Sequence, residues 1–167
     1  VVIEDNGQGI PQAKQKRIFE HGYTTKEEGK GFGLHACANL GWLYTAQGRV
    51  EEADALLTQS LDLARQHLGP DHMITVCCAL KLGILYRAQG RYDEHDPLLT
   101  ELLETCRKCF GEDAVITGFA RFGLDVRRKQ LTALLAEQQT AGDSEGAAGT
   151  SARLEQICLV LGPDSQP

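Results

Sequence analysis

The sequence has 167 residues, of which 42% are apolar and 24% are charged, and its net charge is −6. This is the composition of an ordinary globular protein, and it excludes collagen-like and wholly disordered classes. No segment is strongly basic, so the charge pattern excludes the electrostatic footprint of a nucleic-acid-binding protein. The length suits one domain and is marginal for two.

No apolar run reaches the roughly 20 residues needed to cross a bilayer, and no charged-then-apolar leader opens the chain. We therefore expect no membrane anchor and no secretion signal. The chain begins at Val1 and its single methionine is Met73, so we expect a fragment or a truncated product. Six cysteines in a sequence of this kind indicate reduced thiols and a cytoplasmic protein.

Residues 1–35 contain two glycine-rich turns. The β-branched run Val1–Ile3 predicts a buried strand that ends in the first turn, Asp5–Ile10, and the second turn, Gly29–Leu34, leads into a helix. Closely spaced glycines let backbone N–H groups approach an anion, and a helix start adds its positive end. Together the turns suggest a phosphate cradle, although a plain turn is the commoner explanation for either one alone.

Three motifs in this segment, in their order, resemble the ATP-binding domain of sensor histidine kinases and related Bergerat-type ATPases. They are Asp5–Ile10, Ile18–Lys26 and Gly31–His35. The resemblance implies that Asp5 hydrogen-bonds the adenine amino group of ATP and that residues 11–30 form a mobile lid. It also implies that Gly7 and Gly9 form the turn on the adenine side. The residues that would hold the phosphates are Gly31, Gly33 and Leu34, and Lys30 beside them is compatible with phosphate.

The segment does not contain the parts on which the family's catalysis depends. The helix that bears a Mg²⁺-binding asparagine is missing from the sequence, as is the helix pair that bears a phosphoacceptor histidine. His21 and His35 lie inside the nucleotide motifs, so neither is a natural phosphoacceptor. A lone strand also leaves its backbone groups unpaired. We therefore expect an incomplete α/β remnant that binds ATP weakly, without Mg²⁺ and without catalytic residues of its own.

An internal duplication follows. Residues 36–71 and 78–113 align at an offset of 42 with 17 of 36 positions identical, where unrelated stretches give about three. Apolar residues at three- and four-residue spacing, beginning with Leu40, Leu43 and Tyr44, indicate two helices in each unit that are separated by a short glycine turn. A glycine in mid-helix costs about 1 kcal/mol, so Gly41 and its counterpart Gly83 suggest a helix crossing too close for a larger side chain.

The repeated unit resembles the tetratricopeptide repeat in the 42-residue form found in kinesin light chain. The resemblance implies a mainly α fold, a short solenoid with repeats at 36–71 and 72–113. His95 replaces the small residue Ala53, and Pro97 replaces Ala55, from which we predict a second helix that starts late or is kinked. The family's small and large residues are visible at Leu40, Gly41, Tyr44, Ala53 and Leu57, and again at Leu82, Gly83, Tyr86 and Leu99.

The pattern decays after the second unit. Residues 114–138 predict a degenerate third repeat or a capping helix, because only Leu124 matches its counterpart across residues 120–131. Residues 139–152 show no periodic apolar pattern and predict a flexible linker, so we assign 139–167 to a linker and a short helix around 152–161.

Two cysteines, Cys106 and Cys109, have the spacing of a zinc or redox pair. A tetrahedral zinc site needs two more ligands, and no second pair of matching spacing follows. On a helix both thiols would fall on one face, where small buried cysteines are common. We therefore predict no metal site.

The repeats predict a protein-interaction module from a signalling protein, whose first helices hold an extended peptide or a partner's helix. Trp42 lies about 200° around the helix from Leu40 and so points away from the core stripe, although it could instead pack under the N-terminal segment or a neighbouring molecule. Self-association through the open ends of the stack is a further expectation. The alternative function is an ATP-binding fragment of a sensor histidine kinase whose catalytic residues lie outside this chain. By the family's pattern, the partner-binding positions are Ala38, Trp42 and Thr45 in the first unit and Leu80, Ile84 and Arg87 in the second.

Overall fold

The computed structural model describes residues 32–162, and all regular structure in this range is helical. The prediction of a mainly α fold is confirmed for these residues. The predicted strand Val1–Ile3 and the glycine turns up to Gly31 lie outside the described range. The helices are α2 (Phe32–Ala46), α3 (Val50–Leu68), α4 (Met73–Ala88), α5 (Tyr92–Phe110), α6 (Val115–Ala141) and α7 (Ser144–Leu161).

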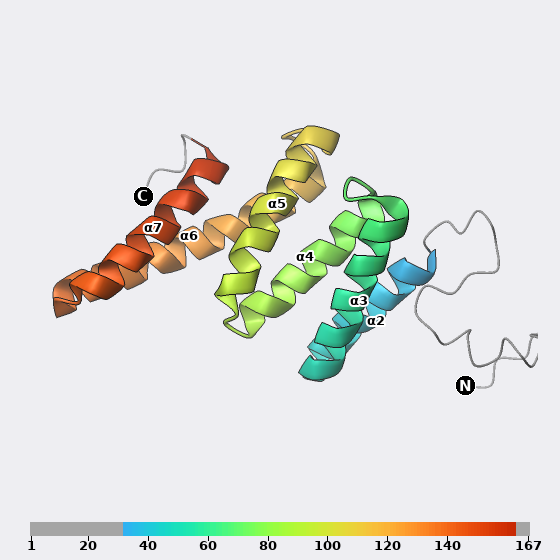
Figure 1. Ribbon diagram of the computed structural model, residues 1–167, viewed down its shortest axis with the longest axis horizontal. Helices are drawn as coiled ribbons and strands as arrows, with labels where there is room; N and C mark the ends of the chain where they lie inside the picture. Colours follow the sequence, from blue (N-terminus) through green and yellow to red (C-terminus); the bar gives the residue numbers. More distant parts are fainter. Residues whose placement is uncertain (1–31, 163–167) are drawn as a thin grey trace, which may run out of the picture.

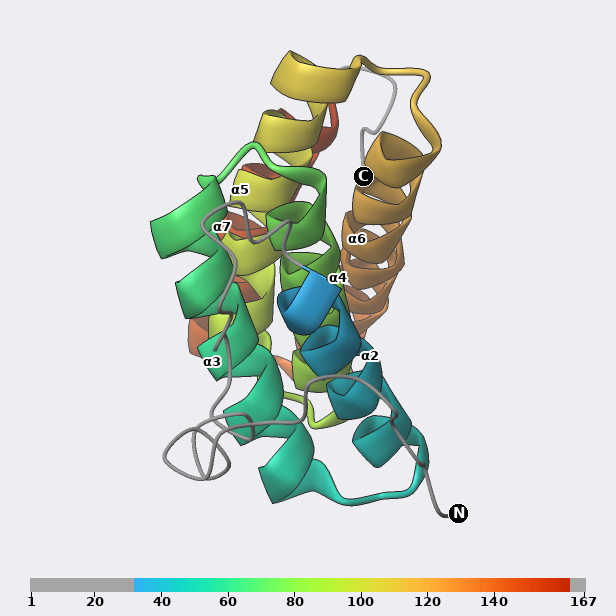
Figure 2. The ribbon, with the colours of Figure 1, turned by 90° about the vertical axis from the view of Figure 1, so that its right-hand side faces the viewer.

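The helices form three hairpins that stack side by side along the long axis of the molecule (Figure 1). Each hairpin pairs two helices that are consecutive in the chain: α2 with α3, α4 with α5, and α6 with α7. Seen from the end, α2, α4 and α6 lie on one side and α3, α5 and α7 on the other (Figure 2). The molecule is therefore a short two-layered helical solenoid, in which each hairpin contacts only its neighbours.

The turn inside each of the first two hairpins explains why Gly-Arg recurs at the offset of 42. Gly48 and Gly90 adopt positive φ angles of 73° and 71°, which glycine tolerates and most residues do not. The guanidinium of the following Arg49 lies 4.0 Å from the centre of the Tyr44 ring, and the equivalent pair in the second hairpin is 4.3 Å apart. The glycine makes the turn, and the cation–π contact holds it against the first helix.

Close helix crossing accounts for the mid-helix glycines, as predicted. A Cβ atom built on Gly41 would lie 2.7 Å from Cγ of Leu57, and one built on Gly83 would overlap a methyl group of Leu99. On the far side of Leu99, Gly123 of α6 would meet a second methyl at 2.5 Å. One leucine side chain of α5 thus packs between two glycines, on α4 and on α6, and joins the second hairpin to the third.

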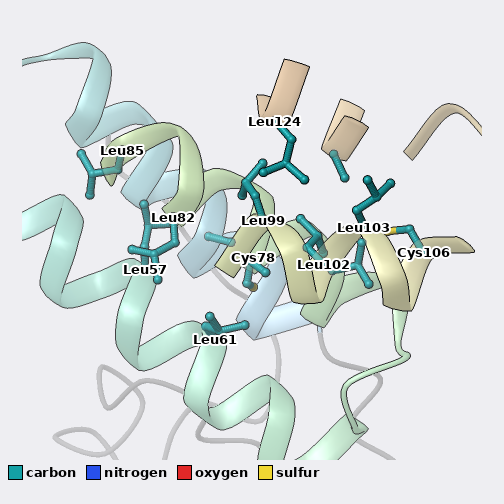
Figure 3. Packing of buried hydrophobic residues seen from close by; sticks show 14 of the residues in the cluster. Leu57, Leu61, Cys78, Leu82, Leu85, Leu99, Leu102, Leu103, Cys106 and Leu124 are labelled. Carbon is teal, nitrogen blue, oxygen red and sulfur yellow. The ribbon is translucent and has the colours of Figure 1, made fainter. Parts of the chain in front are cut away.

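A single apolar core runs from α2 to α7. Figure 3 shows part of it. Each buried leucine stabilises the fold by about 1.5–3 kcal/mol relative to an exposed one. Because every hairpin contributes to the same cluster, the three hairpins are held together by continuous packing. The labelled side chains of its central part come from α3, α4, α5 and α6: Leu57, Leu61, Cys78, Leu82, Leu85, Leu99, Leu102, Leu103, Cys106 and Leu124.

The prediction that Leu40 belongs to a core stripe is wrong, and Leu43, which shares its helical spacing, is exposed as well. Their side chains are 39% and 50% exposed, whereas their counterparts Leu82 and Leu85 are 3% and 1% exposed. α4 packs against α3, the second helix of the hairpin before it, and this contact buries its leucines. Within the described residues no helix precedes α2, so the same positions face outward there.

The second hairpin contradicts the expected late start of its second helix. α5 begins at Tyr92, which is equivalent to Val50 at the start of α3, and both helices have 19 residues. Pro97 lies inside α5 and has no N–H to donate to the carbonyl four residues earlier. The buried contacts of His95 and Leu99 keep the helix continuous despite this missing hydrogen bond.

The flexible linker predicted over residues 139–152 is also wrong. At the position equivalent to Gly90 the third unit has Thr132, so no glycine turn interrupts α6, which runs for 27 residues against 16 in α4. The turn comes instead at Gly142, which has a φ of 75°, and the side chain of Asp143 accepts a hydrogen bond from the N–H of Gly146 to begin α7. Small residues fill the first half of α7, which explains the missing apolar periodicity.

Candidate functional site

The predicted partner-binding positions lie on the layer of first helices. We call the outward side of α2, α4 and α6 the first-helix face. Trp42 of α2, Ile84 of α4 and Val126 of α6 are spaced by 42 residues and therefore occupy equivalent places on three neighbouring helices. The indole of Trp42 is exposed, and the other two side chains are half-buried. The result is a row of apolar side chains that crosses the stack.

A second row on this face changes from buried to exposed along the stack. Ala38 is fully buried, Leu80 is half-buried, and Phe122, at the equivalent place on α6, is 62% exposed. α4 packs against α2 and α6 packs against α4, while no first helix follows α6 within the described residues. Ala38 therefore presents no surface to a partner, whereas Phe122 presents a large one.

The two polar residues among the predicted partner-binding positions, Thr45 and Arg87, have different surroundings. The hydroxyl of Thr45 donates to the carbonyl oxygen of Gly41 at 3.0 Å, so the helix itself satisfies this group. Arg87 is half-buried at the end of α4. Its counterpart on α6 is Lys129, whose Nζ lies 2.9 Å from Oδ2 of Asp125.

Sequence reasoning missed the aromatic residues of α6. Phe119 and Phe122 are both more than half exposed and lie one turn apart on the first-helix face. The third unit has too few identities to stand out as a repeat, but the offset of 42 would have found one of these residues, because Leu80 maps onto Phe122. The offset also maps Ile84 onto Val126.

Charge is distributed unequally between the two layers. The first helices carry six basic and two acidic side chains, whereas the second helices carry four basic and eleven acidic ones. The protein therefore presents a basic layer and an acidic layer, which favour different partners. The basic residues of the first layer are Lys81, Arg87, Arg121, Arg127, Arg128 and Lys129, and its acidic residues are Asp125 and Glu137.

Asp125, one of the two acidic residues of the first layer, is paired. Hydrogen bonds from Lys129 and from Arg128 lower the pKa of its carboxyl group. Asp125 thus stays ionised and offsets part of the positive charge of α6. No comparable acidic group lies on α2 or α4, so the positive potential of the layer comes from side chains along α4 and α6.

Two departures from the repeat pattern meet in a buried polar cluster between α5 and α6. Arg127 stands at the place of Leu85, and its Nε lies 3.2 Å from Oδ2 of Asp96. The other oxygen of this carboxylate is 2.8 Å from Nδ1 of His95, which stands at the place of Ala53. The guanidinium also lies 3.6 Å from the centre of the Tyr92 ring. Each unusual residue therefore supplies a partner for another.

The cysteines show no sign of a metal centre in the described residues, which include all six. No group of three or more His, Cys, Asp or Glu side chains there is placed to hold a metal ion, and none of the thiols forms a disulfide. Cys106 is buried and Cys109 is exposed, so the two do not share a buried face as expected. Burial raises the pKa of Cys78 to about 11 and also raises the pKa of Cys37 and Cys106. These thiols remain protonated at neutral pH.

Most of the predicted nucleotide contacts, from Asp5 to Gly31, lie outside the described residues. Gly33 and Leu34 lie in the first turn of α2, and the side chain of Leu34 is buried in the core. The nucleotide site stays a prediction. Within the described residues, no helix combines the length and apolarity that a membrane crossing requires.

Comparison with known proteins supports the helical-repeat class that the fold defines. Residues 34–108 match the model of the tetratricopeptide repeat family. The chain also resembles the crystal structure of BtubC (BKLC) from P. vanneervenii, with a TM-score of 0.53 and 14% sequence identity. This match covers 91% of the present chain and 73% of that chain. At this identity the likeness shows the fold alone.

Proposed function

We propose that the protein is an interaction module whose first-helix face binds an extended segment of a partner protein. Tetratricopeptide repeats generally bind protein partners, and the match to this family covers the first two hairpins. The observation that carries the proposal is the pair of exposed aromatic side chains on the first-helix face, Trp42 of α2 and Phe122 of α6, with the half-buried Leu80 and Ile84 on α4 between these helices. Exposed apolar patches of this kind, and exposed tryptophans in particular, mark interaction sites.

The charge of the layer supports a partner of defined chemistry. A segment with large apolar side chains would cover these residues, and acidic side chains beside them would match the basic residues of the first helices other than Arg127, whose guanidinium is buried against Asp96. The partner of this face is therefore an acidic segment with aromatic or aliphatic anchors. Because Arg121 and Lys129 are solvent-exposed, added salt weakens the attraction of an acidic segment to them.

Random-sequence peptides displayed on phage and selected against the full chain provide the probe. Peptides bound by the first-helix face quench or shift the fluorescence of Trp42, the single tryptophan. We expect Phe122→Ala to weaken binding of such peptides about tenfold, as for a moderate hot spot. Leu159→Ala, which removes an exposed leucine from the opposite layer, is the matched control and leaves the affinity unchanged. Equal affinity for the Phe122→Ala variant would overturn the proposal.

The segment before α2 supports a second candidate function, because three nucleotide motifs stand there in the order of the histidine-kinase ATPases. We propose weak ATP binding by this remnant. ATP added with and without Mg²⁺ should raise the thermal midpoint of the full chain, since a ligand that binds only the native state stabilises it. Asp5→Asn should abolish the rise. No shift with the unmodified chain counts against nucleotide binding and leaves the peptide-binding proposal intact.

The open end of α2 supports the expected self-association. Leu40 and Leu43 are exposed, and α2 carries no acidic or basic side chain apart from His35. Two copies can therefore bring these apolar side chains together without electrostatic repulsion. A molar mass that rises with protein concentration is the expected result, and Leu43→Lys should suppress the rise. A constant monomer mass excludes this contact. We propose that the module works in the cytoplasm, since its six cysteines are free thiols.

A further inference from the structure

The stack of hairpins ends in two surfaces that have no neighbour within the described residues, and both expose apolar side chains. Figure 1 shows α2 and α3 at one end of the long axis and α6 and α7 at the other. Leu40 and Leu43 of α2 are exposed at the first end, and Phe122 of α6 is exposed at the second. We call these surfaces the N-terminal end face and the C-terminal end face. Exposed apolar surface of this kind marks a contact with another molecule.

The N-terminal end face lacks the second helix of a preceding hairpin. Inside the stack, the positions equivalent to Leu40 and Leu43 are Leu82 and Leu85 of α4, which are buried because α4 packs against α3. Leu124 of α6, which is equivalent to Leu40 and Leu82, is fully buried, and α6 packs against α5. The exposed leucines of α2 therefore have the places that a second helix covers elsewhere in the molecule.

The C-terminal end face lacks the first helix of a following hairpin. Leu34 and Ala38 of α2 are buried, and α4 packs against this helix. At two offsets of 42, their counterparts on α6 are Gly118 and Phe122. The large and the small residue have exchanged places, and a Cβ built on Gly118 meets no atom within 4 Å. Phe122 therefore faces the space that a following first helix would occupy.

α7 has small, uncharged residues where α5 carries a polar cluster. The buried positions of α7 follow those of α5 at an offset of 51, since Thr150, Leu154 and Ile157 stand at the places of Leu99, Leu103 and Cys106. By this offset, α7 has Gly146 and Ala147 at the places of His95 and Asp96, which meet a guanidinium of α6. α3, which covers the leucines of α4, has Ala53 at the place of His95. α7 thus suits a leucine rather than an arginine.

The two end faces are the two halves of an interface that the molecule already forms twice. α4 packs on α2 and α3, and α6 packs on α4 and α5, so each of these first helices lies on both helices of the hairpin before it. In the described residues, α2 is a first helix without a preceding hairpin, and α6 with α7 is a hairpin without a following first helix. α2 carries no acidic or basic side chain apart from His35, so charge on this helix does not oppose the contact.

We propose that copies of the chain stack head to tail, with α2 of one copy packed on α6 and α7 of the copy before it. Leu40 and Leu43 are then buried against α7, and Phe122 is covered by α2, as Ala38 is covered by α4. This inference rests on the self-association proposed above and names the surface that α2 meets. Because the two end faces differ, each contact leaves one of them free on either copy, and the assembly grows beyond two copies.

Stacking also bears on the proposed peptide-binding face. Phe122 is both an anchor of the first-helix face and the residue that α2 of a following copy covers. A peptide seated on Phe122 and a following copy therefore exclude each other, and only the last copy of a stack keeps this side chain open.

Two variants that each block one end face provide the test. Leu43→Lys places a charge on the N-terminal end face, and Phe122→Lys places one on the C-terminal end face. Both side chains are at least half exposed, so both variants should fold. Sedimentation of the full chain measures the molar mass of each variant and of their equimolar mixture.

We expect each variant alone to remain a single copy at concentrations where the unmodified chain exceeds twice its monomer mass. The mixture should reach twice the monomer mass and stop there, because each variant supplies the end face that the other has lost. Phe119→Lys is the matched control and should associate as the unmodified chain does. Phe119 is also an exposed aromatic residue of α6, but its counterpart His35 is exposed even though α4 follows α2, so this position faces outward.

The possible outcomes separate head-to-tail stacking from self-association in general. If the Phe122→Lys variant associates on its own, two α2 surfaces pair with each other, which overturns head-to-tail stacking and leaves self-association intact. A mixture that stays monomeric also overturns the stacking. An unmodified chain that is monomeric at every concentration rules out both the stacking and the self-association.

Discussion

Leu85 on α4 and Arg127 on α6 occupy equivalent places in the second and third hairpins, yet one is an apolar contact and the other a buried guanidinium. Around Leu85 the neighbouring helix α3 offers Ala53 at the small position, and the interface is apolar. Around Arg127 the neighbouring helix α5 offers His95 at that position and turns the carboxylate of Asp96 toward the guanidinium. The same helix geometry thus accepts two chemistries, provided that both sides of the interface change together.

The spaces between second helices also differ. Between α3 and α5, the guanidinium of Arg65 donates to both carboxylate oxygens of Glu101. Between α5 and α7, a groove of about 500 Å³ is lined by five residues of each helix.

Removal of the guanidinium should have the largest effect on stability. Arg127→Ala leaves the partly buried Asp96 carboxylate without its cation, so we expect the free energy of unfolding to fall by up to about 3–5 kcal/mol. Denaturant titration measures this fall. The control is Arg121→Ala, also on α6, which breaks an exposed ion pair with Glu112 of the turn before this helix and should cost about 0–1 kcal/mol.

A double variant distinguishes a lost pair from a lost contact. Arg127→Leu copies the second hairpin at this place, and adding Asp96→Ala removes the unpaired carboxylate as well. We expect the second change to restore a large part of the lost stability, because replacing both buried charges is far cheaper than removing one. If Asp96→Ala lowers stability further, the charges do not act as a pair.

Replacement of a helical glycine by alanine should have a smaller effect, whose sign differs between Gly83 at a helix crossing and Gly118 in open space. Gly83→Ala forces a methyl group against Leu99, and overpacking of this kind costs about 1–3 kcal/mol even though alanine is the better helix former. Gly118→Ala adds a methyl group where no atom lies within 4 Å, so it should stabilise α6 by up to about 1 kcal/mol. Thermal unfolding of the two variants measures both shifts. Equal shifts at the two sites would refute the close crossing.

Part of this architecture could be predicted from the sequence. The offset of 42 predicted the first two hairpins and their turns, because glycine turns, apolar spacing and mid-helix glycines are local properties. α7 could not be found in this way, since its first half is built from small residues whose burial depends on the length of α6. The exposure of Leu40 and Leu43 also escaped prediction, because it depends on which element lies before α2.

The site was less predictable than the fold. Trp42 was placed on the outside by helical geometry alone, but the burial of Ala38 depends on how closely α4 approaches. The pairing of Arg127 with Asp96 and the groove between α5 and α7 join residues far apart in the sequence. Each departure was visible as a break in the repeat, yet only the packed helices show which breaks compensate one another.

The smallest expected effect is on the free energy of unfolding at alkaline pH. It compares the second and third hairpins at one further pair of equivalent positions. Cys78 of α4 and Ala120 of α6 are equivalent and fully buried, so Cys78→Ala copies the third hairpin. The pKa of Cys78 is raised to about 11 in the native state, from about 9 for an unperturbed thiol, because burial disfavours the thiolate. The unfolded chain therefore releases this proton first, and stability is complete below about pH 9 and is lost as the pH rises toward 11.

By pH 10 this linkage should lower the free energy of unfolding by about 1 kcal/mol relative to pH 8, since one unit of pKa shift is worth about 1.4 kcal/mol. The Cys78→Ala variant retains the other titrating groups and should lose about 1 kcal/mol less over the same interval. Cys109→Ala, which removes an exposed thiol from α5, is the control and should keep the full loss. Parallel pH profiles for the protein and its Cys78→Ala variant would contradict this prediction. They would mean that α3 and α5 leave this thiol accessible to water, so that the apolar interior of the second hairpin excludes water no better than the polar interior of the third.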